Sequence, residues 1–470
     1  MRNAITITVT LGLAALVACS TRTPIGGIGA GDGGVHTGGT GLTTGSGGDG
    51  TGGSEFFRTG GAPSSGGANS GGNFGTGGSG EAQVCPTAVG GAAGQSNAPA
   101  FLPATNYRMV GHPGAIAIAD VNGDSRPDLA VATYLPAATG GVSGTGNGTG
   151  GAPSSGGTDG FSSGGAVSVL LNSGSGTFGL PINHPVFTPA SVALGDLSGD
   201  GKADLAVASS LGSVVVLTNS GTGTFADSVT YSVGIRPSAV AVGDLNGDGK
   251  LDIAVANAGR ELGTGDVAVL LNAGGGNFVA ANYMAGSNPA AIAIADLNGD
   301  GKGDLAVANR DSGASVLLNA GDGTFGAPAK YAAGSTPFWV AIGDLNGDGK
   351  PDIALTSASG GGGVAVLLNL GAGKFGAAIV YATGTSPGGI AIGDLNGDGF
   401  PDIATLYSLP DCNGVSVLVN RGTGTFLAPV PFPLAADYPS SLALADLNGD
   451  GRADLAVVSD QQVTVLLNAR

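Results

Sequence analysis

A nine-residue acidic loop occurs seven times in this 470-residue chain and constrains its fold more than any other feature. The third copy reads DLNGDGKLD. The copies begin at Asp120, Asp196, Asp244, Asp296, Asp344, Asp394 and Asp446. After the first interval their starts are 48 to 52 residues apart, a period typical of propellers and arrays of short strands. The repeat predicts seven equivalent structural units.

Every unit has the same order of segments. A proline precedes a short apolar strand, the acidic loop follows, and a second strand such as LDIAVAN comes next. A third strand such as VAVLLN and a turn such as GTGTF lead to a more polar fourth strand. β-branched residues are frequent and no helical period is present beyond the N-terminal segment, which indicates antiparallel sheets of four strands.

The two ends of the array indicate how it closes. The last unit stops after its third strand, at VTVLLNAR, whereas the segment FLPATNYRMVGHP from Phe101 resembles a fourth strand without its own first three. A ring in which the N-terminal strand completes the last blade pairs both ends, which an open array would leave unpaired. The sequence therefore predicts an all-β, seven-bladed β-propeller of four-stranded antiparallel blades over residues 100–470. Residues 135–164 form a low-complexity insertion in the first blade.

The acidic loops and the GTF turns resemble the FG-GAP/VCBS repeats, a family that includes the integrin α-subunit propeller and many bacterial surface proteins. The resemblance implies calcium at loops of the pattern D-x-[DN]-x-D-G-x-x-D, with side-chain ligands at positions 1, 3, 5 and 9 and a backbone carbonyl at position 7. Hard oxygen donors on alternate positions of a short loop also suit calcium on chemical grounds. The alternative is that these acids only form Asx turns without metal.

Up to seven Ca²⁺ ions are expected. The predicted ligands are Asp120, Asn122, Asp124 and Asp128; Asp196, Ser198, Asp200 and Asp204; Asp244, Asn246, Asp248 and Asp252; Asp296, Asn298, Asp300 and Asp304; Asp344, Asn346, Asp348 and Asp352; Asp394, Asn396, Asp398 and Asp402; and Asp446, Asn448, Asp450 and Asp454. Two loops depart from the pattern, with Ser125 at position 6 of the first and Ser198 at position 3 of the second.

The charge balance agrees with this assignment. The chain carries 34 acidic and 17 basic residues, a net charge of −17, and three Asp in each of seven loops account for 21 of the acids. Seven Ca²⁺ would add 14 positive charges and leave −3. An acidic chain of this kind repels nucleic acid and anionic membrane surfaces, so neither is expected as a partner.

The N-terminal segment is interpreted as an export signal. Residues 1–18 combine a basic start with a short apolar stretch and end in Leu16-Val17-Ala18-Cys19, which resembles the lipobox of bacterial lipoproteins. The resemblance implies a lipid on Cys19 as the only membrane contact, and the Ser after it implies an outer-membrane lipoprotein, periplasmic or surface-facing. An ordinary secreted protein cut after Ala18 is the alternative. Residues 19–99 are rich in Gly and Ser and predict a flexible tether.

Two further cysteines, Cys85 and Cys412, lie far apart in the sequence. In an oxidising compartment they could pair, but their spacing does not decide this.

No catalytic motif is present, so the chain is expected to be a non-enzymatic protein- or glycan-binding or adhesion module. One unit breaks the internal symmetry: Phe338 and Trp339 follow its starting proline, where the other six carry small residues. With Arg236 and Tyr438 they are the candidate ligand-binding residues, on the face opposite the calcium loops; local packing is the alternative for the aromatic pair. Rival functions are a carbohydrate-active enzyme or lectin and a structural envelope component.

Overall fold

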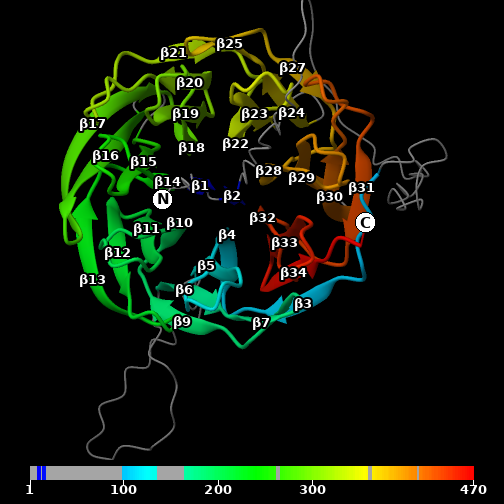
Figure 1. The fold of residues 1–470 in the computed structure, drawn as a ribbon, viewed down its shortest axis with the longest axis horizontal. Coiled ribbons are helices and arrows are strands. Elements are labelled where there is room, and N and C mark those ends of the chain that lie inside the picture. The colour runs from blue at the N-terminus through cyan, green and yellow to red at the C-terminus, as the bar shows by residue number, and fades with distance from the viewer. Residues whose placement is uncertain are drawn as a thin grey trace, which may run out of the picture. The chain divides into compact units, whose positions relative to one another are not determined.

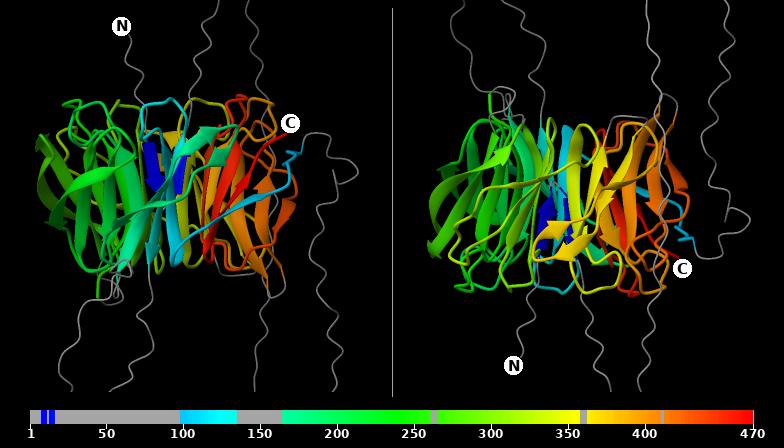
Figure 2. Two further views of the ribbon diagram at one scale, coloured as in Figure 1. Left: turned by 90° about the horizontal axis from the view of Figure 1, so that it is seen from below. Right: turned by 90° about the horizontal axis from the view of Figure 1, so that it is seen from above.

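The computed structural model describes residues 8–11, 13–16, 98–134, 164–260, 265–357, 362–409 and 412–469. Within them, seven antiparallel sheets are arranged as blades around a ring, with the first strand of each blade nearest the centre (Figure 1). The strands run between the two faces of the ring (Figure 2). The predicted seven-bladed propeller is confirmed. In the described part of the chain no helix is long and apolar enough to cross a membrane.

The strands of each blade follow the order of the chain. Blade 1 contains β4 (His112–Ala119), β5 (Asp128–Tyr134), β6 (Gly165–Leu170) and β9 (Ile182–Pro185); blade 2 contains β10 (Pro189–Gly195), β11 (Asp204–Ser209), β12 (Ser213–Asn219) and β13 (Phe225–Ser232). Blade 3 contains β14 (Pro237–Gly243), β15 (Asp252–Asn257), β16 (Gly265–Gly274) and β17 (Asn277–Gly286); blade 4 contains β18 (Pro289–Ala295), β19 (Asp304–Asn309), β20 (Gly313–Leu317) and β21 (Ala329–Tyr331).

Blade 5 contains β22 (Pro337–Gly343), β23 (Asp352–Ser357), β24 (Gly363–Leu367) and β27 (Ile379–Tyr381); blade 6 contains β28 (Ile390–Gly393), β29 (Asp402–Leu409), β30 (Cys412–Leu418) and β31 (Val430–Leu434). Blade 7 contains β32 (Ser441–Ala445), β33 (Asp454–Ser459), β34 (Gln462–Leu466) and β3 (Thr105–Arg108). Two short hairpins at the GTF turns are formed by β7 (Asn172–Gly174) with β8 (Thr177–Phe178) and by β25 (Asn369–Gly371) with β26 (Lys374–Phe375).

The ring closes through the N-terminal strand, as predicted. β3 pairs antiparallel with β34, with Thr105 opposite Val465 and Arg108 opposite Gln462. The pairing continues outside the strands, where the Leu102 amide donates to the Leu467 carbonyl at 2.8 Å. Backbone groups at both ends of the array are therefore satisfied by each other.

Two additional strands lie within the predicted signal segment. β1 (Thr8–Leu11) and β2 (Leu13–Leu16) pair antiparallel, and Ala15 of β2 pairs in parallel with Leu444 of β32. The sheet of blade 7 consequently has six strands rather than four, and the pair lies in the middle of the ring in Figure 1. Cys19, Cys85, the tether apart from Ala98 and Pro99, and the insertion apart from Gly164 lie outside the described residues. Cys412 is a buried free thiol, 3.9 Å from the Tyr407 hydroxyl.

The second strand of each blade is buried over most of its length because both of its faces pack against neighbouring sheets, although Tyr134 at the end of β5 is exposed. In β15 all six residues, DIAVAN, are buried, and the same holds for β19 and β33. Sheets covered on both faces favour continuous apolar runs over strict alternation. The small alanines in these runs let adjacent blades approach closely near the crowded centre of the ring.

Seven aromatic pairs join neighbouring blades at the outer part of the ring. In each, a ring near the fourth strand of one blade meets the phenylalanine of the GTF turn, or its equivalent Phe101, in the next blade. The pairs are Tyr107–Phe178, His184–Phe225, Tyr231–Phe278, Tyr283–Phe325, Tyr331–Phe375, Tyr381–Phe426 and Phe432–Phe101, with centroids 4.9 to 5.5 Å apart and edge-on geometry. Such pairs stabilise beyond the apolar area they bury.

His184 is the exception among these rings. It is 8% exposed, and its Nε2 has no hydrogen-bond partner. In the corresponding positions the hydroxyls of Tyr231 and Tyr283 donate to glycine carbonyls of the next blade. Burial lowers the pKa of His184 below its usual value of 6.5. The imidazole is therefore neutral in the folded protein, and this junction loses stability as the pH falls below 6.5.

We expect His184→Tyr to stabilise the propeller, because it restores a hydroxyl donor and removes a buried base. The gain should be about 1 kcal/mol at neutral pH and larger at pH 5.5, where the unfolded wild-type chain takes up a proton that the folded chain rejects. Denaturant unfolding at the two pH values measures it. The reverse variant, Tyr231→His, should introduce the same acid sensitivity, and equal pH dependence of wild type and His184→Tyr would refute this explanation.

Candidate functional site

The seven acidic loops connect the first and second strands of each blade and share one local structure. The position-1 Asp accepts the backbone N–H of position 4 at 2.7–2.8 Å through Oδ1. Its Oδ2 accepts the N–H of position 6 at 2.7–2.9 Å. Each loop is therefore curled around its first carboxylate.

Position 6 has a left-handed backbone in every loop, which explains the glycine found there. In the third loop Gly249 at position 6 has φ of 81°, and Gly247 at position 4 has φ of 75°. Ser125 holds the same position in the first loop with φ of 64°, a left-handed conformation that strains a residue with a Cβ atom. Its amide still donates to Asp120 at 2.7 Å, which keeps the loop in the shared shape.

A cation at position 7 lies beside the position-5 carboxylate in six loops, a pairing that sequence analysis missed. Lys250 Nζ is 2.6 Å from Asp248 Oδ2, and Lys202 and Lys350 make the same contact with their own loops. The lysine hydrogen bond lowers the pKa of Asp200, Asp248 and Asp348. The sixth loop has Phe400 at this position, 41% exposed, so Asp398 lacks this cation.

The position-9 Asp is fully buried in all seven blades and opens the second strand. Its Oδ2 accepts the N–H of position 2 in its own loop at 2.8–3.1 Å. Its Oδ1 accepts the N–H of an asparagine at the end of the third-strand segment at 2.7–2.8 Å. This residue therefore ties the loop to two parts of the blade.

Burial raises the pKa of these carboxyls strongly despite the two amide hydrogen bonds. It reaches about 6 for Asp128, Asp252, Asp304, Asp352 and Asp454, and about 7 for Asp402, and it is also raised for Asp204. Desolvation is the largest cause, and in the blades with a numerical value the negative charges at positions 5 and 1 add to it. A cation bound in the loop would oppose that repulsion.

The donor set of the loops fits a hard divalent cation. Carboxylate, amide and carbonyl oxygens are the ligands calcium prefers, and a carboxylate oxygen that accepts one N–H retains further acceptor capacity. In the described residues, however, no three carboxylates or other metal-binding side chains converge closely enough to hold an ion. Calcium would also have to displace the position-7 cation from the position-5 carboxylate.

An asparagine at the end of each third-strand segment joins neighbouring blades and was not singled out from the sequence, although it closes VAVLLN and its variants in every unit. The residues are Asn172, Asn219, Asn272, Asn319, Asn369, Asn420 and Asn468. Each Nδ2 donates to the carbonyl at position 8 of its own loop at 2.8–3.2 Å. Each also donates, at 2.7–2.9 Å, to the position-2 carbonyl of the loop in the preceding blade.

These bonds form a closed circuit. The backbone N–H of Leu197 donates to Asp204 in blade 2, and the Leu197 carbonyl accepts a hydrogen bond from the side-chain amide of Asn272 in blade 3. The backbone N–H of Asn272 in turn donates to Asp252. The same step repeats in every blade, and Asn172 closes the circuit on Leu447 of blade 7. The acidic loops are thus hydrogen-bonded to one another around the ring. In the sequence, the only sign of this connection is the Asn that recurs at the end of each third-strand segment.

The candidate ligand residues lie at the opposite ends of the first strands, on the other face of the ring, which we call the irregular face. Phe338 and Trp339 are half-buried at the start of β22. Trp339 packs against the apolar core cluster of blades 4 to 7. The guanidinium carbon of Arg310 lies 4.5 Å from the centroid of the Phe338 ring. Trp339 therefore has a packing role, whereas Phe338 supports a cation.

Arg236 and Tyr438 precede unit-start prolines and both project from strained backbone. Their φ angles are 55° and 48°, and Tyr438 is 79% exposed. The equivalent residues Thr188, Asn288, Thr336 and Ser386 also have positive φ. This conformation is a feature of the turn in most blades, so it does not by itself mark a binding site.

A His–Asp pair also lies on the irregular face. His112 Nδ1 is 2.5 Å from Asp460 Oδ1, and the imidazole stacks on Tyr134 with centroids 5.2 Å apart. In the described part of the chain no hydroxyl or thiol is hydrogen-bonded to His112, so the pair is not joined to a nucleophile. The Ser440 hydroxyl instead donates to backbone carbonyls, including that of Pro113 at 3.3 Å.

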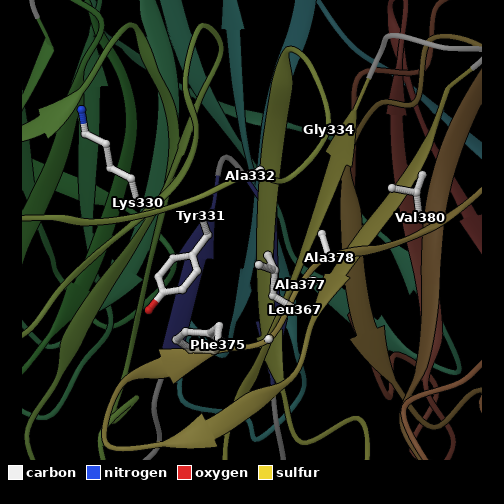
Figure 3. Close-up of a pocket in the computed structure, with 10 residues that line it drawn as sticks. Lys330, Tyr331, Ala332, Gly334, Leu367, Phe375, Ala377, Ala378 and Val380 are labelled. Carbon is white, nitrogen blue, oxygen red and sulfur yellow. The ribbon is translucent and has the colours of Figure 1, made fainter. Parts of the chain in front are cut away.

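A groove of about 550 Å³ lies between blades 4 and 5 (Figure 3). Tyr331 and Phe375, the aromatic pair of this junction, line it together with small residues such as Ala377 and Ala378. Lys330 is its only charged lining residue. The groove is a seam between blades and brings together no catalytic or metal-binding group.

Comparison with known proteins identifies the repeat. The FG-GAP-like repeat matches residues 196–255, 244–307, 296–355, 344–405 and 406–457, together more than half of the chain. No curated protein matches the sequence. Solved structures with a similar fold include BBS1N in complex with ARL6DN, from crystals soaked with mercury (TM-score 0.52) or lead (TM-score 0.50). Both are 12% identical in sequence, and each match covers 79% of this chain and 97% of the other.

Proposed function

Because the chain belongs to the FG-GAP-like repeat family, we propose that it is a calcium-stabilised, non-enzymatic binding or adhesion module for a protein or glycan. The observation that carries this proposal is the contrast between the two faces. The acidic loops are nearly identical in all seven blades and bonded into one circuit, so they serve the whole ring equally. The irregular face carries the residues that differ from blade to blade, which is where a specific ligand is recognised.

Calcium in the acidic loops is part of this proposal. It is supported by the oxygen donor set and by the preformed curl of every loop. It is also supported by the three carboxylates within nine residues, because a bound cation would offset their mutual repulsion. The predicted ligands are the residues at positions 1, 3, 5 and 9 given above. The ion would supply positive charge that links the exposed carboxylates to the buried one.

We further propose that the protein is an outer-membrane lipoprotein, anchored through Cys19 and held off the membrane by residues 19–99. The support is the lipobox-like sequence and the Gly/Ser-rich composition. Cleavage before Cys19 would remove β1 and β2, so the mature propeller would have four strands in blade 7.

Capture of partners from cell-surface extracts tests the binding function. The propeller with calcium is expected to retain a partner, and Arg236→Ala combined with Tyr438→Ala should reduce capture because both side chains project from the irregular face. Phe400→Ala is the matched control, an exposed aromatic residue on the face of the acidic loops. Capture that depends on Phe400 and not on Arg236 and Tyr438 would contradict the proposal.

A glycan array separates the two ligand classes and the lectin alternative. Specific glycan binding that is lost in Trp339→Ala, with an unchanged melting curve, would identify a lectin. Hydrolysis of a bound glycan would instead identify a carbohydrate-active enzyme. Absence of glycan binding together with retained protein capture identifies a protein-binding module, and absence of both leaves the structural envelope role.

A further inference from the structure

Three consecutive blades each place a residue without an equivalent in the other units in one sector of the irregular face. Arg236 is the only Lys or Arg before a unit-start proline. Arg310 is the only Lys or Arg directly after a second strand, and Phe338 is the only aromatic residue directly after a unit-start proline. In a ring of repeats, structural roles recur in every unit, so residues that break the repeat together indicate a local role.

Direct contacts connect these three positions across blades 3, 4 and 5. The Ser238 hydroxyl, two residues after Arg236, donates to the Pro289 carbonyl of blade 4 at 2.8 Å. The adjacent Asn288 carbonyl accepts the backbone N–H of Arg310 at 3.1 Å. The Arg310 guanidinium then lies over Phe338 of blade 5. Burial lowers the pKa of Arg310, the nearby charge of Arg236 lowers it further, and the carboxylate of Asp311 partly opposes the shift.

Neither guanidinium forms an ion pair with a carboxylate in the described part of the chain. Among the described residues no carboxylate lies within ion-pair distance of Arg236 or Arg310, although six other cations pair with Asp in the acidic loops. The Nε of Arg310 is buried without an acceptor. An unsatisfied buried donor destabilises the fold, and more so when the group is charged. Asp311 acts on Arg310 from beyond ion-pair distance, so two like charges that no described carboxylate pairs directly are complementary to an anion from outside the chain.

We propose that Arg310 and Arg236 bind the carboxylate of an acidic side chain in a protein partner, with Phe338 holding the Arg310 guanidinium in place. The planar guanidinium matches a carboxylate with two parallel N–H···O bonds, and the Phe338 ring restricts its rotation. A single carboxylate on an otherwise neutral segment is favoured over an acidic polysaccharide, because the chain stays net negative, at −17 without metal and −3 with seven Ca²⁺, and does not attract a polyanion. This inference rests on the proposed binding function and names its ligand chemistry.

A pair of peptides tests it. The two hexapeptides have blocked termini and uncharged residues, except that one carries a single Glu where the other carries Gln. Binding is measured by calorimetry and by the fluorescence of Trp339, the only tryptophan. The Glu peptide is expected to bind about tenfold or more tightly than the Gln peptide. Arg310→Met should remove that preference, and Arg310→Lys should retain part of it because the charge remains without the planar fork.

Arg421→Met is the control, since Arg421 is exposed in the turn after the third strand of blade 6. It should bind the Glu peptide like the wild type, and melting curves must show that all variants are folded. Equal binding of the two peptides, or wild-type binding by Arg310→Met, would overturn the inference. Arg310-dependent binding of oligogalacturonate without binding of the Glu peptide would overturn the assignment to a protein side chain. Partner capture that survives Arg310→Met would leave the proposed function standing and remove only this site.

Discussion

Removal of calcium is expected to lower the melting temperature of the propeller by roughly 10 °C or more. Each site that binds only the folded chain adds about 2.7 kcal/mol when free calcium exceeds its Kd 100-fold, and seven equivalent loops are available. Several such contributions amount to a shift of this size even in a large domain, where 1 kcal/mol moves the midpoint by only a few degrees. Thermal unfolding in excess calcium and in excess chelator measures the effect.

The chelation experiment needs a control for ionic strength, and magnesium provides it. Magnesium demands a smaller octahedral site and should restore much less stability at equal concentration. Equal melting curves with and without chelator would refute the hypothesis that calcium stabilises the fold, and the acidic loops would then be metal-free Asx turns. Asp248→Asn should reduce the calcium-dependent rise in melting temperature by about the contribution of one of the seven loops.

The pH dependence should change sign with calcium. Five of the position-9 carboxyls have a pKa of about 6 in the folded chain and Asp402 has one of about 7, against a usual value of 3.8. Between these values the folded chain binds more protons, so without metal the propeller should gain stability as the pH falls from 7 to 5. With calcium the same change should lower stability, because protons compete with the ion for the carboxylates.

Asn272→Ala is expected to destabilise the propeller by about 2–5 kcal/mol. The side chain donates to the Leu197 carbonyl of blade 2 and the Leu251 carbonyl of its own blade, and it accepts the Gly274 amide. It is 3% exposed, so its loss leaves three polar groups without partners in a site that excludes water. Denaturant unfolding measures the difference.

Two variants sharpen this second result. Asn272→Asp keeps the shape but loses both N–H donors, so it should destabilise at least as much as Asn272→Ala. Asn277→Ala is the matched control, an exposed asparagine in the same turn, and should change stability by about 0.5 kcal/mol or less. Stability of Asn272→Ala equal to that of the control would show that the circuit between loops does not hold the blades together.

Breaking the circuit should also affect the neighbouring loop. Leu197 is position 2 of the loop in blade 2, and its peptide connects Asp204 to Asn272. If calcium binds the loops, Asn272→Ala should weaken binding in blade 2 as well as in blade 3. Calcium titration of the single-loop variants Asp200→Asn and Asp248→Asn, each with and without Asn272→Ala, separates the two contributions.

The sequence by itself determined the number of blades, the strand order within each and the closure of the ring. It could do so because strand periodicity, turn chemistry and repetition are local properties that recur in every unit. The closure was predictable because the N-terminal strand lacks a blade of its own and the last unit lacks a fourth strand, so the two complete one blade. The curl of each loop was also predictable, since the position of Gly depends only on the local backbone. Ser125 with φ of 64° shows that even the local exception could be foreseen.

Only the tertiary structure decided which side chains meet between blades. Asn272 and Leu197 are 75 residues apart, and Phe338 and Arg310 belong to different units, so no local pattern places them together. Trp339, the only tryptophan of the sequence, packs against the core. Arg310, which belongs to no sequence motif, has a buried Nε donor without an acceptor. Repetition reveals the scaffold because every unit solves the same packing problem, and contacts between units depend on the ring that brings them together.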